Sequence, residues 1–142
     1  MAFNVLIVDD SAVMRTMVRR TLCMAGLALG EIHEAAHGVE ALALLQEHWI
    51  DVALLDVNMP VMNGEELVRR LRADVALASI AIVVVSTERS ETRIAALRAL
   101  GAEFIPKPFA PETLRDVILR ITGEPDDHRT DDRALQGSSS DF

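Results

Sequence analysis

The sequence predicts an α/β fold in which a five-stranded parallel sheet is covered by helices on both faces. Short apolar runs of strand length alternate along the chain with segments of helical period. Several of these runs are continuously apolar, which is typical of parallel strands buried on both faces and joined by right-handed helical crossovers. The expected strands are residues 4–8, 31–36, 51–56, 80–85 and 104–106.

Five helices are expected after these strands. The first carries a stripe of apolar residues from Val13 to Ala25, with Ser11 as its N-cap and Gly26 as its end. Cys23 falls within this apolar pattern, so we expect its side chain in the core. The other helices are expected at residues 38–48, 64–73, 90–100 and 111–121.

Composition limits the class of protein. The formal net charge of −8 is opposite in sign to a surface that binds nucleic acid directly. A single cysteine excludes an internal disulfide and fits a reducing compartment. There is no apolar run of membrane-spanning length and no basic leader of a signal peptide, so a soluble cytoplasmic protein without membrane insertion is expected.

Residues 123–142 are acidic and polar, and we expect them to form a disordered tail.

Side chains suited to chemistry stand at the ends of four expected strands. Asp9 and Asp10 follow the first strand, Asp56 ends the third, Ser86 follows the fourth and Lys107 follows the fifth. The C-terminal ends of parallel strands share one edge of the sheet, and ligands bind outside that edge. We therefore expect these five residues to form one site.

Three carboxylates placed so close together repel one another unless a cation joins them. Oxygen ligands favour a hard ion such as Mg²⁺. A carboxylate beside a bound divalent ion can act as a nucleophile toward phosphorus, so Asp56 is a candidate phosphoacceptor. The alternatives are helix capping for Asp9 and Asp10, a solvated loop acid for Asp56, and a surface lysine for Lys107.

Together these segments resemble the receiver domains of bacterial two-component response regulators, in particular the stand-alone, CheY-like type. The resemblance runs from about residue 4 to residue 121 and implies a receiver domain over residues 1–122. It also implies a flavodoxin-like, doubly wound sheet with strand order 2-1-3-4-5. The motifs that carry it, in chain order, are residues 5–11 (VLIVDDS), residues 54–64 (LLDVNMPVMNG), Ser86, and residues 104–109 (FIPKPF).

The resemblance implies roles for individual residues. Asp56 would accept a phosphoryl group from a sensor histidine kinase or a phosphotransfer protein. Mg²⁺ would be held by Asp10, Asp56 and the backbone carbonyl of Asn58, with Asp9 helping through water. Lys107 would neutralise the charge of the phosphoryl group.

Further implied features concern the switch and its surroundings. Ser86 would be the switch hydroxyl, and Phe104 the switch aromatic, although Phe104 has no hydroxyl to donate. The bond between Lys107 and Pro108 would be cis. Ala110 stands where such sequences often have Ser or Thr, so the last helix would lack a side-chain N-cap.

The resulting expectation is a phosphoacceptor signalling protein, not a turnover enzyme. It would act in chemotaxis or a phosphorelay by binding an unknown protein target, as a monomer or a phosphorylation-dependent dimer. A phosphatase with an aspartyl nucleophile is disfavoured because Asn58 stands where a second acid is needed. Dinucleotide binding is disfavoured because Asp9 and Asp10 replace a glycine-rich turn. A phosphate-independent interaction module with the same residues stays open as the alternative.

Overall fold

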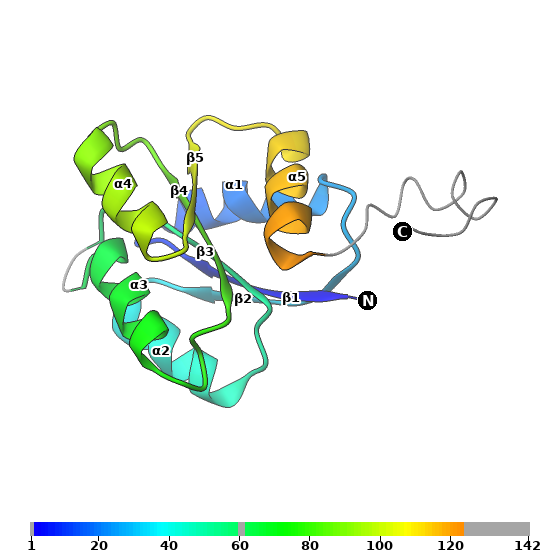
Figure 1. Cartoon of the computed structure of the whole chain (residues 1–142). Coiled ribbons are helices and arrows are strands. Elements are labelled where there is room, and N and C mark those ends of the chain that lie inside the picture. The colour runs from blue at the N-terminus through cyan, green and yellow to red at the C-terminus, as the bar shows by residue number, and fades with distance from the viewer. Residues whose placement is uncertain (1, 60–61, 124–142) are drawn as a thin grey trace.

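The structure of this protein is a computed structural model that describes residues 2–59 and 62–123 (Figure 1). Five parallel strands form one sheet in the order β2-β1-β3-β4-β5, which confirms the predicted strand order. The predicted tail lies outside the described residues except for Gly123. In the described part of the chain, none of the helices combines the length and apolar character that a membrane crossing requires.

Strands and helices alternate along the described chain as the apolar pattern predicts. Their bounds are β1 (Phe3–Val8), α1 (Ala12–Cys23), β2 (Leu29–Ala35), α2 (Gly38–Glu47), β3 (Val52–Leu55), α3 (Gly64–Ala73), β4 (Ala81–Ser86), α4 (Glu91–Ala99), β5 (Glu103–Pro106) and α5 (Pro111–Thr122). The prediction placed β2 at 31–36, whereas this strand begins at Leu29, which pairs with Phe3. β2 lies at the edge of the sheet, and most of its residues are exposed or half-buried, so its apolar pattern in the sequence is weak. Backbone pairing with β1 holds it in the sheet.

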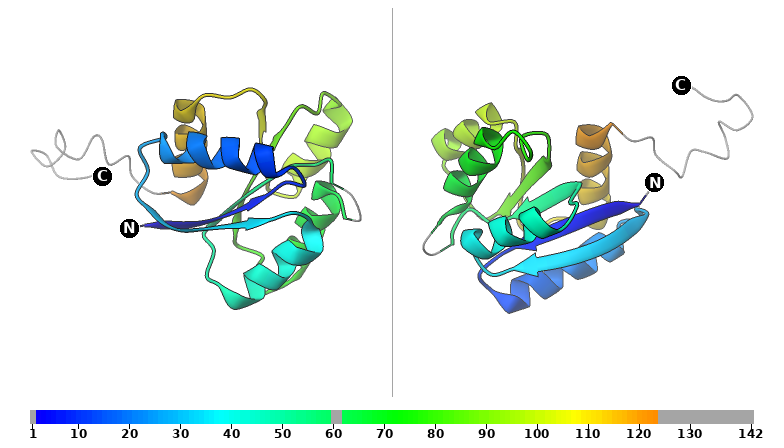
Figure 2. Two further views of the ribbon diagram at one scale, coloured as in Figure 1. Left: turned by 180° about the vertical axis from the view of Figure 1, so that it is seen from behind. Right: turned by 90° about the horizontal axis from the view of Figure 1, so that it is seen from below.

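The two faces of the sheet bury alternate side chains of its strands. On β1, Val5 and Ile7 point to the face covered by α1 and α5, while Leu6 and Val8 point to the face covered by α2, α3 and α4. Figure 2 shows α1 and α5 on one side of the sheet and α2 on the other. Because successive side chains of a strand alternate between faces, a continuously apolar strand serves both cores.

The predicted core position of Cys23 is wrong, because its side chain is exposed. Helix α1 buries Val18 and Leu22, and the next residue lies about 100° further round a helix with 3.6 residues per turn. Val13 and Met17 are also exposed, at 69% and 55%. The apolar stripe of α1 is therefore wider than the surface that the sheet covers.

The N-caps of the first and last helices, α1 and α5, agree with the prediction from the sequence. The Ser11 hydroxyl accepts a hydrogen bond from the Met14 amide at 3.2 Å, which confirms Ser11 as the N-cap of α1. Helix α1 ends at Cys23, earlier than expected, and Gly26 lies in the following turn with φ 81°. At α5, Ala110 gives no side-chain cap, as expected, and Pro111 occupies the first turn.

Arg72 ties the end of α3 to two distant segments. Its guanidinium donates to the carbonyls of Ala78 at 2.8 Å, Ile80 at 2.7 Å, Leu100 at 2.7 Å and Gly101 at 3.1 Å. Burial lowers the pKa of the Arg72 guanidinium from its usual value. One side chain thus satisfies carbonyls in the segments that lead into β4 and β5.

We expect Arg72→Met to lower the free energy of unfolding by about 2–4 kcal/mol, because partly buried carbonyls lose their donors. Urea unfolding followed by circular dichroism measures this loss. Arg70→Met is the matched control, since among the described residues Arg70 pairs only with Glu66, an exposed partner on the same helix, and it should cost less than about 0.5 kcal/mol. Equal losses in the two variants would contradict the tethering role.

Glu34 joins β2 to α1 through two arginines. Its carboxylate accepts from Arg15 Nε at 3.0 Å and from Arg19 Nε at 2.8 Å. Burial opposes ionisation of this carboxyl, but the hydrogen bonds from Arg19 and Arg15 outweigh it and lower the pKa of Glu34.

A lowered carboxyl pKa stabilises the folded protein above the ordinary glutamate pKa, and this stabilisation is lost as the pH falls through the lowered value. Glu34→Gln should therefore cost about 1 kcal/mol at neutral pH and progressively less in acid. Urea unfolding of both proteins across this pH range provides the measurement. A cost that does not change with pH would show that the charge of Glu34 is not what stabilises the contact.

Candidate functional site

Backbone pairing at the C-terminal edge of the sheet sets where the predicted site residues stand. The amide of Asp9 donates to a carbonyl of β2 at 3.1 Å, and the amide of Asp56 donates to the Val8 carbonyl at 3.0 Å. The amide of Lys107 donates to the Ser86 carbonyl at 2.9 Å. Each bond prolongs a strand pairing at its C-terminal end, so these residues leave the sheet at one common edge.

The three predicted aspartates lie close together at this edge. Asp9, Asp10 and Asp56 each offer a carboxylate oxygen within 4.8 Å of those of the other two. Asp9 is buried, Asp56 is half-buried and Asp10 is exposed. Lys107 also reaches the cluster, with its Nζ 3.4 Å from Asp9 Oδ2. Three negative charges and one positive charge leave an excess that a cation can neutralise.

The buried Asp9 shows the cost of this arrangement. Burial raises the pKa of the Asp9 carboxyl, and the charge of Asp56 raises it further. The amide of Ser11, 2.9 Å from Asp9 Oδ1, and the ammonium of Lys107 act in the opposite direction without cancelling the rise. A cation beside Asp9 would favour its charged form.

Helix capping does not account for the aspartates. The N-cap of α1 is Ser11, and in the described chain no acidic residue lies in the first turn of this helix. Asp9 accepts from the Ser11 amide before the helix begins, but its other oxygen faces Lys107. Asp10 remains exposed at the same edge as Asp56. The arrangement is that of oxygen ligands able to hold a hard cation.

Gly64 allows α3 to begin directly against the Asp56 segment. A Cβ atom at this position would lie 2.7 Å from Val57 Cα and would also overlap the Asp56 carbonyl. The Gly64 amide donates to the Val57 carbonyl at 2.8 Å, and the Asn58 amide lies 3.4 Å from Asp56 Oδ1. From the sequence Gly64 is the start of a helix and the last residue of the motif at 54–64, whereas its close backbone approach depends on tertiary packing.

Ser86 and Phe104 lie on the face of the sheet that α4 covers. Ser86 is the last residue of β4 and is fully buried, with its Oγ accepting from the Glu88 amide at 3.1 Å. Phe104 pairs with Val84 in the β4–β5 register and packs half-buried against the core on this face. The register places Phe104 two residues before the partner of Ser86, so the two side chains share a face.

Arg93 is a site residue that the sequence did not single out. Its guanidinium lies 2.8 Å from Glu88 Oε1, 3.4 Å from Asn58 Oδ1 and 3.9 Å from Glu65 Oε1. It thus connects the segments that follow β3 and β4 at the rim of the site. The sequence feature that could have indicated Arg93 is its position in the first turn of α4, three residues after the N-cap Ser90.

An apolar groove opens beside Lys107. Its volume is about 330 Å³, and α1 and the segments after β4 and β5 form its walls. The bond between Lys107 and Pro108 is cis, as the resemblance implied. The residues that line the groove are Met14, Met17, Val18, Thr21, Thr87, Lys107, Pro108 and Phe109.

The chain is similar to known proteins. The family model for the response regulator receiver domain matches residues 5–119. The chain is 39% identical over 122 residues to a chemotaxis protein CheY homolog of Campylobacter jejuni, covering 84% of this chain and 92% of that protein. It is 38% identical over 125 residues to chemotaxis protein CheY1 of Helicobacter pylori, covering 87% and 99%.

A solved structure of chemotaxis protein CheY4 from Vibrio cholerae is similar as well. The TM-score is 0.74 at 41% sequence identity, and the match covers 85% of this chain and 99% of that one. The family model spans more than half of the chain, and the solved structure shares its fold over the matched part. The chain belongs to the response regulator receiver domain family.

Proposed function

We propose that this protein is a response regulator that accepts a phosphoryl group on Asp56 and transmits the signal by binding a protein partner. The observation that carries the proposal is the meeting of Asp9, Asp10, Asp56 and Lys107 at one edge of the sheet. Membership of the receiver family and the chemotaxis relatives support a role in chemotaxis. Residues 1–122 are the receiver domain in this proposal.

Asp56 is the nucleophile because it combines position with access. Its carboxylate is half-buried at the sheet edge, whereas Asp9 is buried and engaged with Ser11 and Lys107. A carboxylate oxygen of Asp56 attacks the phosphorus of a phosphohistidine, forming the O–P bond. The P–N bond breaks, and its electron pair stays on the imidazole nitrogen of the donor. The phosphoryl group is transferred once per cycle, so the protein is a phosphoacceptor and not a turnover enzyme.

The aspartates fit a hard cation, and Mg²⁺ is the ion we propose. Asp10, Asp56 and the Asn58 backbone carbonyl would hold it, and Asp9 would act through water. When bound, the ion neutralises charge on the oxygens of the phosphoryl group in transfer. Lys107, which reaches Asp9, would add a second positive charge to the site.

Lys107 is free to change partner at little cost. Its Nζ lies 3.4 Å from Asp9 Oδ2, longer than the roughly 2.7–2.9 Å of a strong charged hydrogen bond. A phosphoryl oxygen on Asp56 would therefore compete well for this ammonium group. Ser86 would turn its hydroxyl from the Glu88 amide toward the same phosphoryl group.

These movements of Lys107 and Ser86 would convert the protein from its unphosphorylated state to its phosphorylated state. Withdrawal of Ser86 leaves space on the face that it shares with Phe104, and the half-buried ring of Phe104 can move inward. The surface formed by α4, β5 and α5 changes with it. A protein that prefers the changed surface shifts the equilibrium by its difference in affinity for the two states.

The upstream partner is a sensor histidine kinase or a phosphotransfer protein. Its phosphohistidine must reach Asp56, and the apolar groove beside Lys107 offers a surface for the part of the donor that surrounds this histidine. Met17 of α1 lines this groove and is 55% exposed. Exposed apolar side chains beside a reactive site favour contact with an apolar partner surface.

The experiment that tests the proposal is reaction of the full chain with acetyl phosphate, with and without Mg²⁺, followed by intact mass spectrometry. We expect the wild type to gain the mass of one acid-labile phosphoryl group only when Mg²⁺ is present. Asp56→Asn should gain none, because the amide is not a nucleophile toward phosphorus. Asp116→Asn is the matched control, since Asp116 is an exposed aspartate of α5, and it should react like the wild type.

Failure of the wild type to gain a phosphoryl group would overturn the proposal and favour a phosphate-independent interaction module. Equal labelling of Asp56→Asn would place the phosphoacceptor elsewhere. Circular dichroism spectra of all variants show whether any loss of labelling follows from misfolding.

A further inference from the structure

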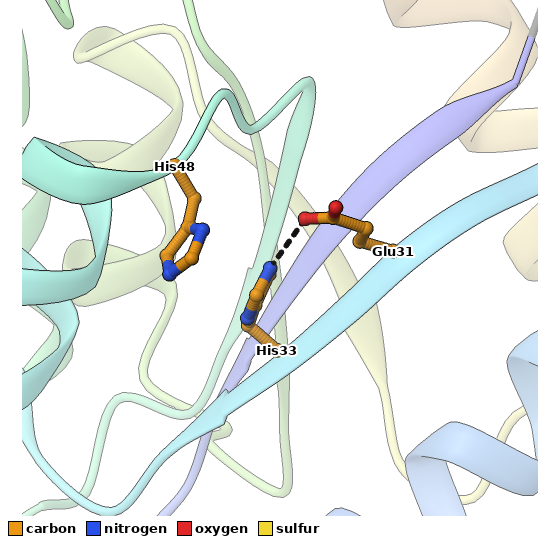
Figure 3. Close-up of side chains that lie close together, drawn as sticks. All are labelled: Glu31, His33 and His48. Carbon is orange, nitrogen blue, oxygen red and sulfur yellow. Dashed lines mark hydrogen bonds and ion pairs between the residues drawn. The ribbon is translucent and has the colours of Figure 1, made fainter.

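A second group of metal-ligating side chains lies away from the aspartates. Glu31 and His33 on β2 and His48 directly after α2 each offer a ligand atom, and these atoms lie within 4.8 Å of one another (Figure 3). His33 Nε2 is 2.9 Å from Glu31 Oε1. The rings of His33 and His48 are stacked, with centroids 4.1 Å apart.

The fold separates this group from the phosphoacceptor edge. Glu31 and His33 are two residues apart on β2, so both point to the face that α2 covers. His33 pairs with Leu6, which lies three residues before Asp9, a rise of about 10 Å along the strand. His48 stands before β3, at the opposite end of that strand from Asp56.

The ion pairs of Glu31 differ from those of Glu34, which lies on the other face of β2. Glu34 is paired with Arg15 and Arg19. Among the described residues, the ion pairs of Glu31 and Glu47 are with histidines only, namely His33 at 2.9 Å and His48 at 3.9 Å. In the described part of the chain, neither carboxylate has the arginine partners that Glu34 has.

We propose that Glu31, His33 and His48 form a binding site for a divalent transition-metal ion with the ligand preferences of Zn²⁺. Two imidazoles and a carboxylate suit zinc and its neighbours in the first transition row, whereas Mg²⁺ prefers oxygen ligands alone. Glu47, already near His48, or water completes the coordination. The site goes beyond the proposed phosphoacceptor function and does not depend on it.

Exposure of the three side chains gives the ion a path from solvent. Their exposed fractions are 66% for Glu31, 22% for His33 and 35% for His48. Binding replaces the hydrogen bond between His33 and Glu31 with metal bonds. It also requires the His48 ring to turn, because a metal lies in the plane of each imidazole that binds it and the two rings are now stacked. The bound ion would join the edge strand β2 to the end of α2.

Calorimetric titration of Zn²⁺ into the full chain, with saturating Mg²⁺ present, tests the site. We expect one equivalent to bind the wild type and Asp56→Asn alike. His33→Gln and His48→Gln should each weaken binding at least tenfold. His37→Gln is the matched control and should bind like the wild type. His37 caps α2 through the Glu40 amide and is not in the group.

Spectroscopic readouts keep the test decisive if a histidine variant misfolds. Co²⁺ bound by imidazole gives visible absorption bands, which Glu31→Gln should alter without unfolding the chain, because Glu31 is exposed. Trp49, the only tryptophan, follows His48 and should be quenched by bound Co²⁺. Absence of Zn²⁺ binding to the wild type, or equal affinity in all histidine variants, would overturn the proposal.

Discussion

Repulsion among the carboxylates of Asp9, Asp10 and Asp56 is the constraint on which the rest of the site depends. Parallel pairing brings the ends of β1 and β3 side by side, so the chain cannot separate these charges without giving up backbone hydrogen bonds. Lys107 offsets part of the repulsion from the end of β5, yet the pKa of Asp9 stays raised because the carboxyl is buried. The proposed Mg²⁺ would offset the remaining repulsion, and the proposed phosphoryl group would compete with Asp9 for Lys107.

Arginines hold the segments around this edge in place. Arg15 donates to the Asp9 carbonyl at 2.6 Å while pairing with Glu34, so it links α1, the end of β1 and β2. Arg93 connects the segments after β3 and β4 from α4. Planar guanidinium groups suit this task because they donate to several acceptors in fixed directions. The loops that carry the chemistry are thus fastened to helices on both faces of the sheet.

Much of this arrangement was predictable because buried parallel strands have a simple sequence pattern. An apolar run followed by a carboxylate, as at Val8 and Asp9, indicates both the strand and the edge where its end emerges. The cis bond at Lys107 and the places of Ser86 and Phe104 were expected from the family resemblance instead. Cys23 was misplaced because helical period alone does not show how wide a stripe the sheet covers. Arg93 was missed because its importance lies in contacts between segments distant in sequence, and the close approach of Gly64 to the Asp56 segment depends on tertiary packing in the same way.

The most direct test of the account is a crystal structure of the full chain with Mg²⁺ and beryllium trifluoride, which adds to a carboxylate as a phosphoryl group would. We expect beryllium bonded to a carboxylate oxygen of Asp56, one Mg²⁺ held by Asp10, Asp56 and the Asn58 carbonyl, and Lys107 moved from Asp9 onto a fluorine. The Ser86 hydroxyl should also reach a fluorine, with Phe104 turned inward. Lys107 still on Asp9, with neither beryllium trifluoride nor metal at Asp56, would contradict the proposed function.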